Sequence, residues 1–391
     1  MTTTDQNILL RGITWNHTRG YLPMVATGQR FSEMHPGIEI RWEKRSLQEF
    51  ADYPVEKLAD TFDLLVIDHP FSGYAAAHPV LLPLDEYLSA DFLIEQAAES
   101  VGKSHESYFY AGHQWALAID AATPVSCWRP ELAERYGVSL PKTWEELLTL
   151  ARHGRVVMPC IPVDSLMHFF MLCASLGEEP GSQTGRLISE EVGARALLML
   201  KELTSLCTRD IFGWNPIAVY EAMTLRDDYV YCPFAYGYSN YARGGYARTR
   251  LQFGDLVQIG SNGPARSTLG GTGLAVSSRC THKQAALDYM RFVAGSGCQR
   301  TLYAYNGGQP AHRSAWMDEA LNNHCGDFFG RTLPTVERAY LRPRYDGYIR
   351  FQDKAGILVH RCLQTEDDAC ALIQALQRIY AESPAHNWKG D

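Results

Sequence analysis

The first 70 residues switch between the hydrophobic patterns of strands and of helices. Residues 7–14 and 38–44 read as strands, since the second of them alternates with a period of two. Residues 62–68 form a continuous apolar run, which is typical of a strand buried on both faces. Helical spacing separates these segments, over 20–37 and over 47–61. The order β-α-β-α-β predicts a parallel, doubly wound sheet with right-handed crossovers.

Further along the chain the helical pattern dominates. PKTWEELLTLARHG (141–154) predicts a helix with Thr143 as its N-cap, Glu146 at the capping-box position and Gly154 as its stop. Residues 160–230 also read as helical. The tyrosine-rich stretch 229–243 reads as a strand that runs into an exposed aromatic loop. Four more elements are predicted: a strand over 115–119, a short strand over 274–276 and helices over 282–294 and 366–383.

Chain length and charge restrict the class of protein. At 391 residues the chain exceeds one usual hydrophobic core, so we expect two lobes. The net charge of -8, with scattered Lys and Arg residues, argues against general nucleic-acid binding. No apolar run approaches the ~20 residues of a membrane span, and MTTTDQN has no pattern of a secretory signal. We therefore expect a cytoplasmic location for the sequence as it stands, or a periplasmic one if a leader preceded it.

The ten cysteines and thirteen histidines show no metal-binding spacing. No C-x-x-C, H-x-x-x-H or H-E-x-x-H pattern occurs, so we expect no metal site and no cofactor. Several cysteines lie within apolar helical patterns, which favours buried, reduced thiols. Their even number also allows disulfides, but their spacing does not require them.

Polar and aromatic residues gather where the predicted strands end. In doubly wound sheets ligands bind beyond the carboxyl ends of the strands. The first strand runs into Trp15, a possible stacking platform, and Arg19, a candidate anion grip at a helix start. Two alternatives stay open: Trp15 as a core residue, and Asp68 as a cap of the turn that follows it. The expected ligand contacts are Trp15, Asn16, His17, Arg19, Asp68, His69, Asp120, Tyr236, Tyr238, Gly271, Thr272 and Asn306.

Two glycine-rich stretches have a structural interpretation. GGTG (270–273) lacks the spacing of a phosphate-binding loop, so close backbone approach at a hinge is favoured. Asn306 to Gly308 is expected to form the third crossover between the lobes.

Four segments together resemble a known family. RFSEMHPGIEIRWE, RPELAERYGVSLPKTWEELLTLAR, GGTGLAVSSRCTHKQAALDYMRFVAGSGCQRTLY and NGGQPAHRSAW follow in the order typical of the extracellular solute-binding proteins, family 1. These are the sugar-type, maltose-binding-protein-like proteins of ABC importers. The chain departs from them at VSCWRP (125–130) and in lacking a signal peptide.

The resemblance implies a two-lobe, type II periplasmic-binding-protein-like α/β fold. Each lobe would be a doubly wound, mostly parallel sheet, and the lobes would close by hinge bending. The expected lobes are 1–120 plus 274–310 and 121–273 plus 311–391.

Two functions follow from this fold. The first is a solute-binding protein that closes on a sugar or a carboxylate-bearing molecule in the interlobe cleft and delivers it to an ABC permease. The alternative is a cytoplasmic enzyme on the same scaffold, for which thiaminase is a precedent. Its candidate catalytic residues are His17, His69, Asp68, Asp120 and Cys127.

Overall fold

The chain forms two compact units in a computed structural model, which describes residues 7–46, 55–365 and 367–383. Unit 1 comprises residues 1–121 and 270–323, and unit 2 comprises 122–269 and 324–391. The last boundary lies at 323 rather than at the expected 310. The reason is that residues 309–313 bond to unit 1: Gln309 and Ala311 carbonyls accept from Ala121 and Val101, and the Arg313 N–H donates to Glu99.

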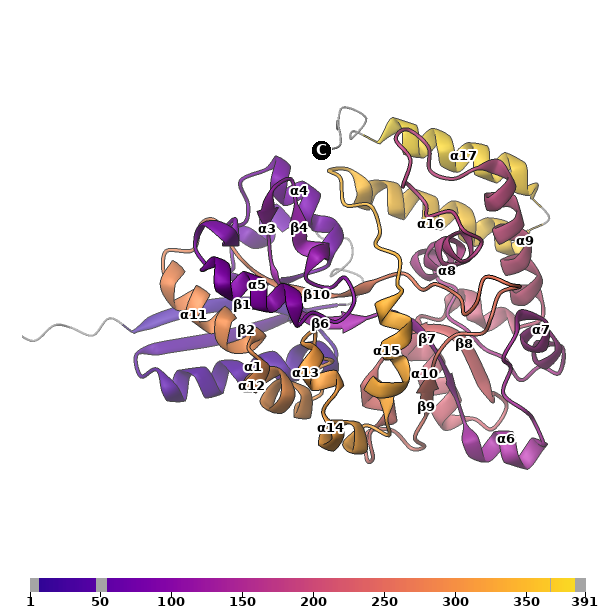
Figure 1. Ribbon diagram of the computed structural model, residues 1–391, viewed down its shortest axis with the longest axis horizontal. Helices are drawn as coiled ribbons and strands as arrows, with labels where there is room; N and C mark the ends of the chain where they lie inside the picture. Colours follow the sequence, from indigo (N-terminus) through magenta and orange to yellow (C-terminus); the bar gives the residue numbers. More distant parts are fainter. Residues whose placement is uncertain (1–6, 47–54, 366, 384–391) are drawn as a thin grey trace, which may run out of the picture. The chain divides into compact units, whose positions relative to one another are not determined.

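Unit 1 contains one five-stranded sheet and the helices that cover it (Figure 1). Its elements are β1 (Ile8–Trp15), α1 (Thr18–Met34), β2 (Ile38–Arg45), α3 (Val55–Ala59), β3 (Leu64–Ile67), η1 (His69–Phe71), α4 (Ser72–Ala77), η2 (Leu84–Glu86), α5 (Ala90–Ala98), η3 (Glu106–Tyr108), β4 (Phe109–Tyr110), β5 (His113–Gln114), β6 (Leu117–Ala122), β10 (Gly270–Val276), α11 (Lys283–Ala294), α12 (Ser296–Cys298), η6 (Gln299–Tyr303), α13 (Arg313–Trp316) and α14 (Glu319–His324).

The sheet of unit 1 has the order β2-β1-β3-β10-β6. The pairs β1–β2 and β1–β3 are parallel, as the β-α-β-α-β pattern predicts. Strand β3 is buried along its whole length, which confirms the prediction from its continuous apolar run. Strand β10 runs antiparallel to β3, and Gly273 pairs with Ile67. The expected helix over 47–61 is described only from Val55 onward, as α3; its earlier residues lie outside the described part of the chain.

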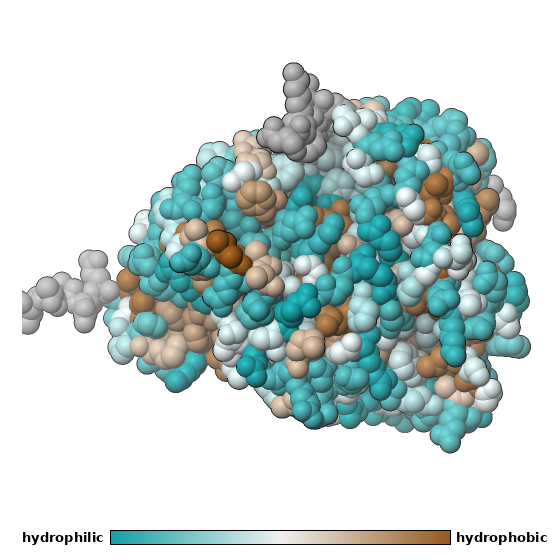
Figure 2. Space-filling model, in the orientation of Figure 1, coloured by the Kyte–Doolittle hydropathy of each residue, from teal (hydrophilic) through white to brown (hydrophobic). Residues whose placement is uncertain are grey.

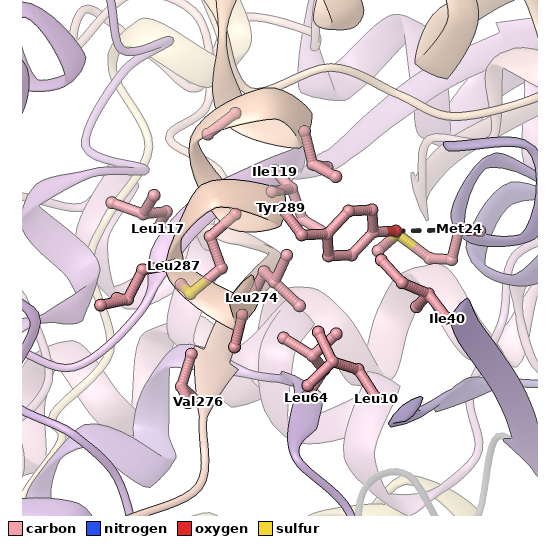
Figure 3. Packing of buried hydrophobic residues seen from close by; sticks show 14 of the residues in the cluster. Leu10, Met24, Ile40, Leu64, Leu117, Ile119, Leu274, Val276, Leu287 and Tyr289 are labelled. Atoms are coloured by element: carbon pink, nitrogen blue, oxygen red, sulfur yellow. Dashed lines mark hydrogen bonds between the residues drawn. The ribbon is translucent and has the colours of Figure 1, made fainter. Parts of the chain in front are cut away.

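The core of unit 1 forms between the sheet and the helices α1 and α11. Leu10, Leu64 and Leu274 from the sheet are fully buried. Figure 3 shows Tyr289 of α11 reaching toward α1, with its hydroxyl 3.3 Å from the carbonyl oxygen of Met24. That hydroxyl also accepts from Trp42 Nε1 at 3.2 Å. The Tyr289 side chain therefore joins the sheet and both helices while its polar atom stays bonded.

Unit 2 is mainly helical around a small sheet. Its elements are β7 (Pro124–Trp128), α6 (Pro130–Tyr136), α7 (Trp144–Arg152), α8 (Pro162–Ser175), α9 (Glu190–Ser205), η4 (Arg209–Gly213), α10 (Pro216–Leu225), β8 (Tyr231–Tyr236), η5 (Ser239–Ala242), β9 (Gln252–Gly254), α15 (Phe328–Glu337), α16 (Tyr348–Gln364) and α17 (Ala369–Glu382). Thr143 caps α7 as predicted, since its hydroxyl accepts from the Glu146 N–H.

The sheet of unit 2 differs from the expected mostly parallel one. Its order is β8-β7-β9, and both β8 and β9 run antiparallel to β7. The sequence did not reveal β9, because three residues are too few to show a period. Only the isolated bridge from Val156 to Tyr231 runs parallel to β8.

One face of the molecule is mostly polar. The face shown in Figure 2 is largely hydrophilic, and its apolar residues form small, separate patches. Within the described part of the chain, no helix combines the length and the apolar character needed to cross a bilayer.

Candidate functional site

One edge of the unit 1 sheet gathers several of the predicted site residues. The parallel strands β1 and β3 end there, at Trp15 and before Asp68. Strand β10 begins there, because it runs antiparallel to β3 and pairs Gly273 with Ile67. The backbone of Gly271 approaches that of Asp120: a Cβ at position 271 would lie 2.2 Å from the Asp120 carbonyl oxygen. The fold thus brings Trp15, Asp68, Asp120, Gly271 and Thr272 to one edge.

Arg19 and Asp120 form a buried ion pair at this edge. Arg19 Nε donates to Asp120 Oδ2 at 2.8 Å, and Nη2 donates to Oδ1. Both residues are at most 4 % exposed. Burial raises the pKa of Asp120, and the Arg19 guanidinium opposes that shift. The expected anion grip is therefore not supported, because the guanidinium already binds a carboxylate of its own unit.

Trp15 is a core residue of unit 1. Its side chain is 4 % exposed and belongs to the buried cluster of that unit. The ring lies against Gly20, where an added Cβ would approach Trp15 Cδ2 to 2.3 Å. Trp15 thus occupies the core, which is the alternative that the sequence left open. A buried ring does not support its interpretation as a stacking platform.

His17 and Asn16 differ in their surroundings. His17 caps α1: its Nδ1 accepts from the Arg19 N–H at 3.0 Å. Burial, followed by the charge of Arg19, lowers the pKa of His17 to about 4, so the imidazole is neutral at pH 7. Asn16 is exposed. Asn16 is therefore the most exposed residue at the start of α1, and His17 beside it is half-buried.

Asp68 caps the turn after β3. Its Oδ1 accepts from the His69 N–H at 2.8 Å and lies 3.1 Å from His69 Nδ1. The Asp68 carboxylate is half-buried, whereas His69 is fully buried. The capping role that the sequence left open is therefore present.

Thr272 has an unusual hydroxyl. The residue is 5 % exposed, and its Oγ1 is buried without a hydrogen-bond partner among the described residues. An unsatisfied buried hydroxyl costs free energy, and native structures seldom retain one without a reason. It follows Gly271, whose φ of +99° only glycine adopts readily. The close backbone approach expected for the glycine-rich stretch is confirmed at Gly271, and the stretch itself is the start of β10.

The aromatic loop of unit 2 is buried, so the expectation of an exposed loop is wrong. Tyr238 is 6 % exposed and Tyr241 1 % exposed. Tyr220 of α10, which the sequence analysis missed, packs 5.0 Å from the Tyr241 ring and donates to the Tyr236 carbonyl oxygen at 2.8 Å. The Tyr236 hydroxyl lies 3.2 Å from Thr268 Oγ1. The helical pattern around Tyr220 gave no sign that it would organise this loop.

Asn306 lies within unit 1 and does not form a crossover. Its Nδ2 donates to the Leu302 carbonyl oxygen at 2.8 Å, and Gly307 follows with φ of +100°. Gln309, which the sequence analysis missed, is 1 % exposed and donates to the Ala121 carbonyl oxygen at 2.8 Å. The sequence signal that could have revealed this contact is the side-chain amide of Gln309, which stands between Gly308 and Pro310 in the NGGQP motif. These contacts hold the segment to β6.

The enzyme alternative finds no support in the structure. Cys127 and His69 are fully buried, and they belong to different units. Burial raises the pKa of Cys127 well above its ordinary value, which disfavours the thiolate that a nucleophile requires. Across residues 7–46, 55–365 and 367–383, no three His, Cys, Asp or Glu side chains are grouped so as to hold a metal ion.

Solved structures with the same fold bind sugars or polyols. A maltose-bound T. maritima protein is 19 % identical, with a TM-score of 0.82, 95 % of this chain covered and 98 % of that one. A solute-binding protein from Agrobacterium radiobacter K84 in complex with ribitol is 16 % identical (TM-score 0.82; 97 % and 100 % covered). The GacH receptor of Streptomyces glaucescens, solved unliganded and with acarbose, is also 16 % identical (TM-score 0.80; 97 % and 99 % covered). At these identities the likeness shows the type II periplasmic-binding-protein fold.

A search of curated proteins gives no match. The sequence profile of the bacterial extracellular solute-binding proteins, by contrast, matches residues 26–323, which is most of the chain. That match begins within α1 and includes β2, β3 and β10 of unit 1 as well as β7, β8 and β9 of unit 2, so it covers elements of both units. The chain belongs to the family of bacterial extracellular solute-binding proteins.

Proposed function

We propose that this solute-binding protein binds a small, uncharged, hydroxyl-rich ligand, a sugar or a sugar alcohol, and delivers it to an ABC permease outside the cytoplasm. The ligands of similar structures support this class: maltose, ribitol and acarbose. The extracellular character of the family supports the location. Membership in that family also argues against the cytoplasmic location expected from the sequence.

The charges at the unit 1 sheet edge support a neutral ligand over a carboxylate. Arg19 is bound to Asp120, so its charge is already balanced. Asp68 adds a half-buried carboxylate, which accepts hydrogen bonds from hydroxyl groups and repels an anion. His17 is neutral at pH 7 and adds no positive charge.

The buried hydroxyl of Thr272 is the observation that carries the proposal. It lies one residue from Gly273, the partner of Ile67, and so next to Asp68 at the edge where β1 and β3 end. A ligand hydroxyl that bonds to Thr272 Oγ1 would satisfy this group. Asn16, His17 and Asp68 of unit 1 remain proposed contacts of this ligand. Tyr236 and Tyr238 remain proposed ligand contacts of unit 2. Trp15, Arg19 and Asp120 shape the edge from within.

Calorimetry with maltose, ribitol and citrate tests the ligand class. Maltose or ribitol should bind and citrate should not. The Thr272→Val variant removes the hydroxyl at nearly constant volume and should weaken binding about tenfold, the value of one hydrogen bond of ~1.4 kcal/mol. Thr204→Val is the matched control, because the Thr204 hydroxyl bonds only within α9, to the Leu200 carbonyl oxygen at 3.0 Å, and to Lys201.

Two results would overturn this proposal. If citrate bound tightly and neither maltose nor ribitol bound, the ligand would be an anion rather than a neutral sugar or sugar alcohol. Equal affinities of the wild type and the Thr272→Val variant for the bound sugar would remove Thr272 from the site.

A further inference from the structure

The antiparallel ladder of unit 2 places two cysteines directly opposite each other. Cys127 of β7 is the register partner of Cys232 of β8. Side chains of directly opposed residues lie on the same face of a sheet and are close neighbours. Both residues are fully buried, and both thiols are free in the structure. None of the other eight cysteines faces another cysteine across a strand pair among the described residues.

The spacing of opposed strand positions suits a disulfide. Opposed Cα atoms in antiparallel strands are about 4.5 or 5.5 Å apart, depending on the hydrogen-bonding type of the pair. Disulfides join Cα atoms about 4.4–6.8 Å apart, so either type of pair falls within the range. Burial and, after it, the Cys232 thiol raise the pKa of Cys127, which is consistent with two neighbouring thiols. The ladder shifts register between Val125 and Cys127, yet its pairing at Cys127 places the two cysteines at a spacing that a disulfide can span.

Packing around the pair decides when the bond can form. Cys127 Sγ lies 3.7 Å from Met223 Sδ of α10, which covers the pair. Burial raises the pKa of Cys127, so the folded protein offers little thiolate for exchange. A disulfide reagent has access only before β7, β8 and α10 have packed together.

We propose that Cys127 and Cys232 form a structural disulfide when this chain folds in an oxidising compartment, such as the one in which extracellular proteins mature. The oxidant is a small or protein-borne disulfide. One cysteine thiolate attacks it and forms a mixed disulfide, and the other cysteine displaces the reagent. The Sγ–Sγ bond forms, two protons and two electrons leave the chain, and the disulfide of the reagent becomes two thiols. This inference rests on the family's extracellular character and on the ladder, and it is independent of the ligand proposed above.

Refolding in glutathione tests the bond. The full chain is reduced and unfolded in urea, refolded in a mixture of oxidised and reduced glutathione, quenched in acid and alkylated. Non-reducing peptide mapping by mass spectrometry should find one linked pair that joins Cys127 and Cys232. Native protein that folded under reducing conditions should keep both thiols in the same buffer for hours. The pairing would be overturned if Cys127 and Cys232 were both found alkylated in the refolded monomer. It would also be overturned if either formed its disulfide mainly with another cysteine. Rapid oxidation of the native protein would overturn its timing.

Thermal unfolding gives a second readout. The oxidised protein should unfold about 4 to 9 °C above the reduced one, which corresponds to the ~2–4 kcal/mol typical of a disulfide in a unit of this size. Cys232→Ser should abolish this difference. Cys173→Ser, which alters an equally buried thiol on α8 with no cysteine opposite, should keep it. A difference that survives in Cys232→Ser would contradict the proposal. If either variant fails to fold, the peptide map of the wild type still decides.

Discussion

Separating Arg19 from Asp120 should destabilise unit 1 strongly and unequally. Replacing Asp120 with Asn leaves a guanidinium buried without a counter-charge, and Arg cannot shed its proton. Replacing Arg19 with Met leaves a carboxyl group that can take up a proton, because burial already raises the pKa of Asp120. We therefore expect Asp120→Asn to be the more harmful change, and the cost of Arg19→Met to grow as the pH rises.

The burial of the pair sets the size of the effect. The two side chains are 5 % and 0 % exposed, so neither charge can recover its hydration in the variants. Removing one partner of such a pair costs about 3–5 kcal/mol. For a unit of roughly 175 residues, an unfolding entropy of about 2.1 cal/mol/K per residue converts this to about 8 to 14 °C. The double variant Arg19→Met/Asp120→Asn should recover much of the loss, since no charge remains buried.

Hydrogen exchange of the backbone amides measures this cost within unit 1. Peptides that cover β1 and β6 should exchange faster in both single variants, whereas peptides from α8 in unit 2 serve as internal controls. Urea denaturation of the four proteins of the cycle gives the coupling free energy. Single variants that each unfold within about 1 kcal/mol of the wild type would refute the reasoning. A double variant as unstable as the sum of the single ones would do the same.

Two further predictions concern single positions. Asp164 of α8 is fully buried, and burial raises its pKa to about 8, so unit 2 should lose stability as the pH rises above the unfolded pKa and through that value. Between pH 6.5 and 8 the loss should be about 1.5–2 kcal/mol in urea titrations and absent in Asp164→Asn; an equal slope in both proteins would contradict this. Gly271→Ala should cost about 2–4 kcal/mol, because its Cβ would strike the Asp120 carbonyl oxygen and its φ is positive. Gly137→Ala, where φ is +61° and the space is open, is the control in thermal unfolding, and an equal loss in both would rule out the steric cause.

Much of the fold could be predicted from local patterns. A pattern of a few residues is enough to predict each of three elements: the period-two strand β2, the continuously apolar strand β3 and the capped helix α7. The antiparallel sheet of unit 2 could not be predicted in this way. Its strands are separated by long helical stretches, and β9 is too short to carry a pattern. The late boundary at 323 depends on hydrogen bonds to distant residues such as Val101 and Ala121.

The places of the candidate residues in the fold were predictable, but their contacts were not. The rule that ligands bind beyond strand ends located the edge with Asp68 and Thr272. It could not show that Arg19 meets Asp120, because 101 residues separate them in the sequence. Trp15 illustrates the same limit: the neighbouring Gly20 accommodates its ring, and only the packing of α1 on β1 reveals this. The type of a residue and its position in the sequence identify it as a candidate. Whether its side chain is already bonded to another residue depends on contacts between distant parts of the chain.

The strand order of unit 1 also governs the timing of its folding. Strand β10 lies between β3 and β6, yet it is separated from them in sequence by residues 122–269 of unit 2. On a ribosome that adds about 5–20 residues per second, the inner edges of β3 and β6 would await their partner for about 8 to 30 s. During that interval the emerging chain holds an unfinished sheet, and the core of unit 1 cannot be completed. The discontinuous strand order thus delays the folding of unit 1 until β10 has been synthesised.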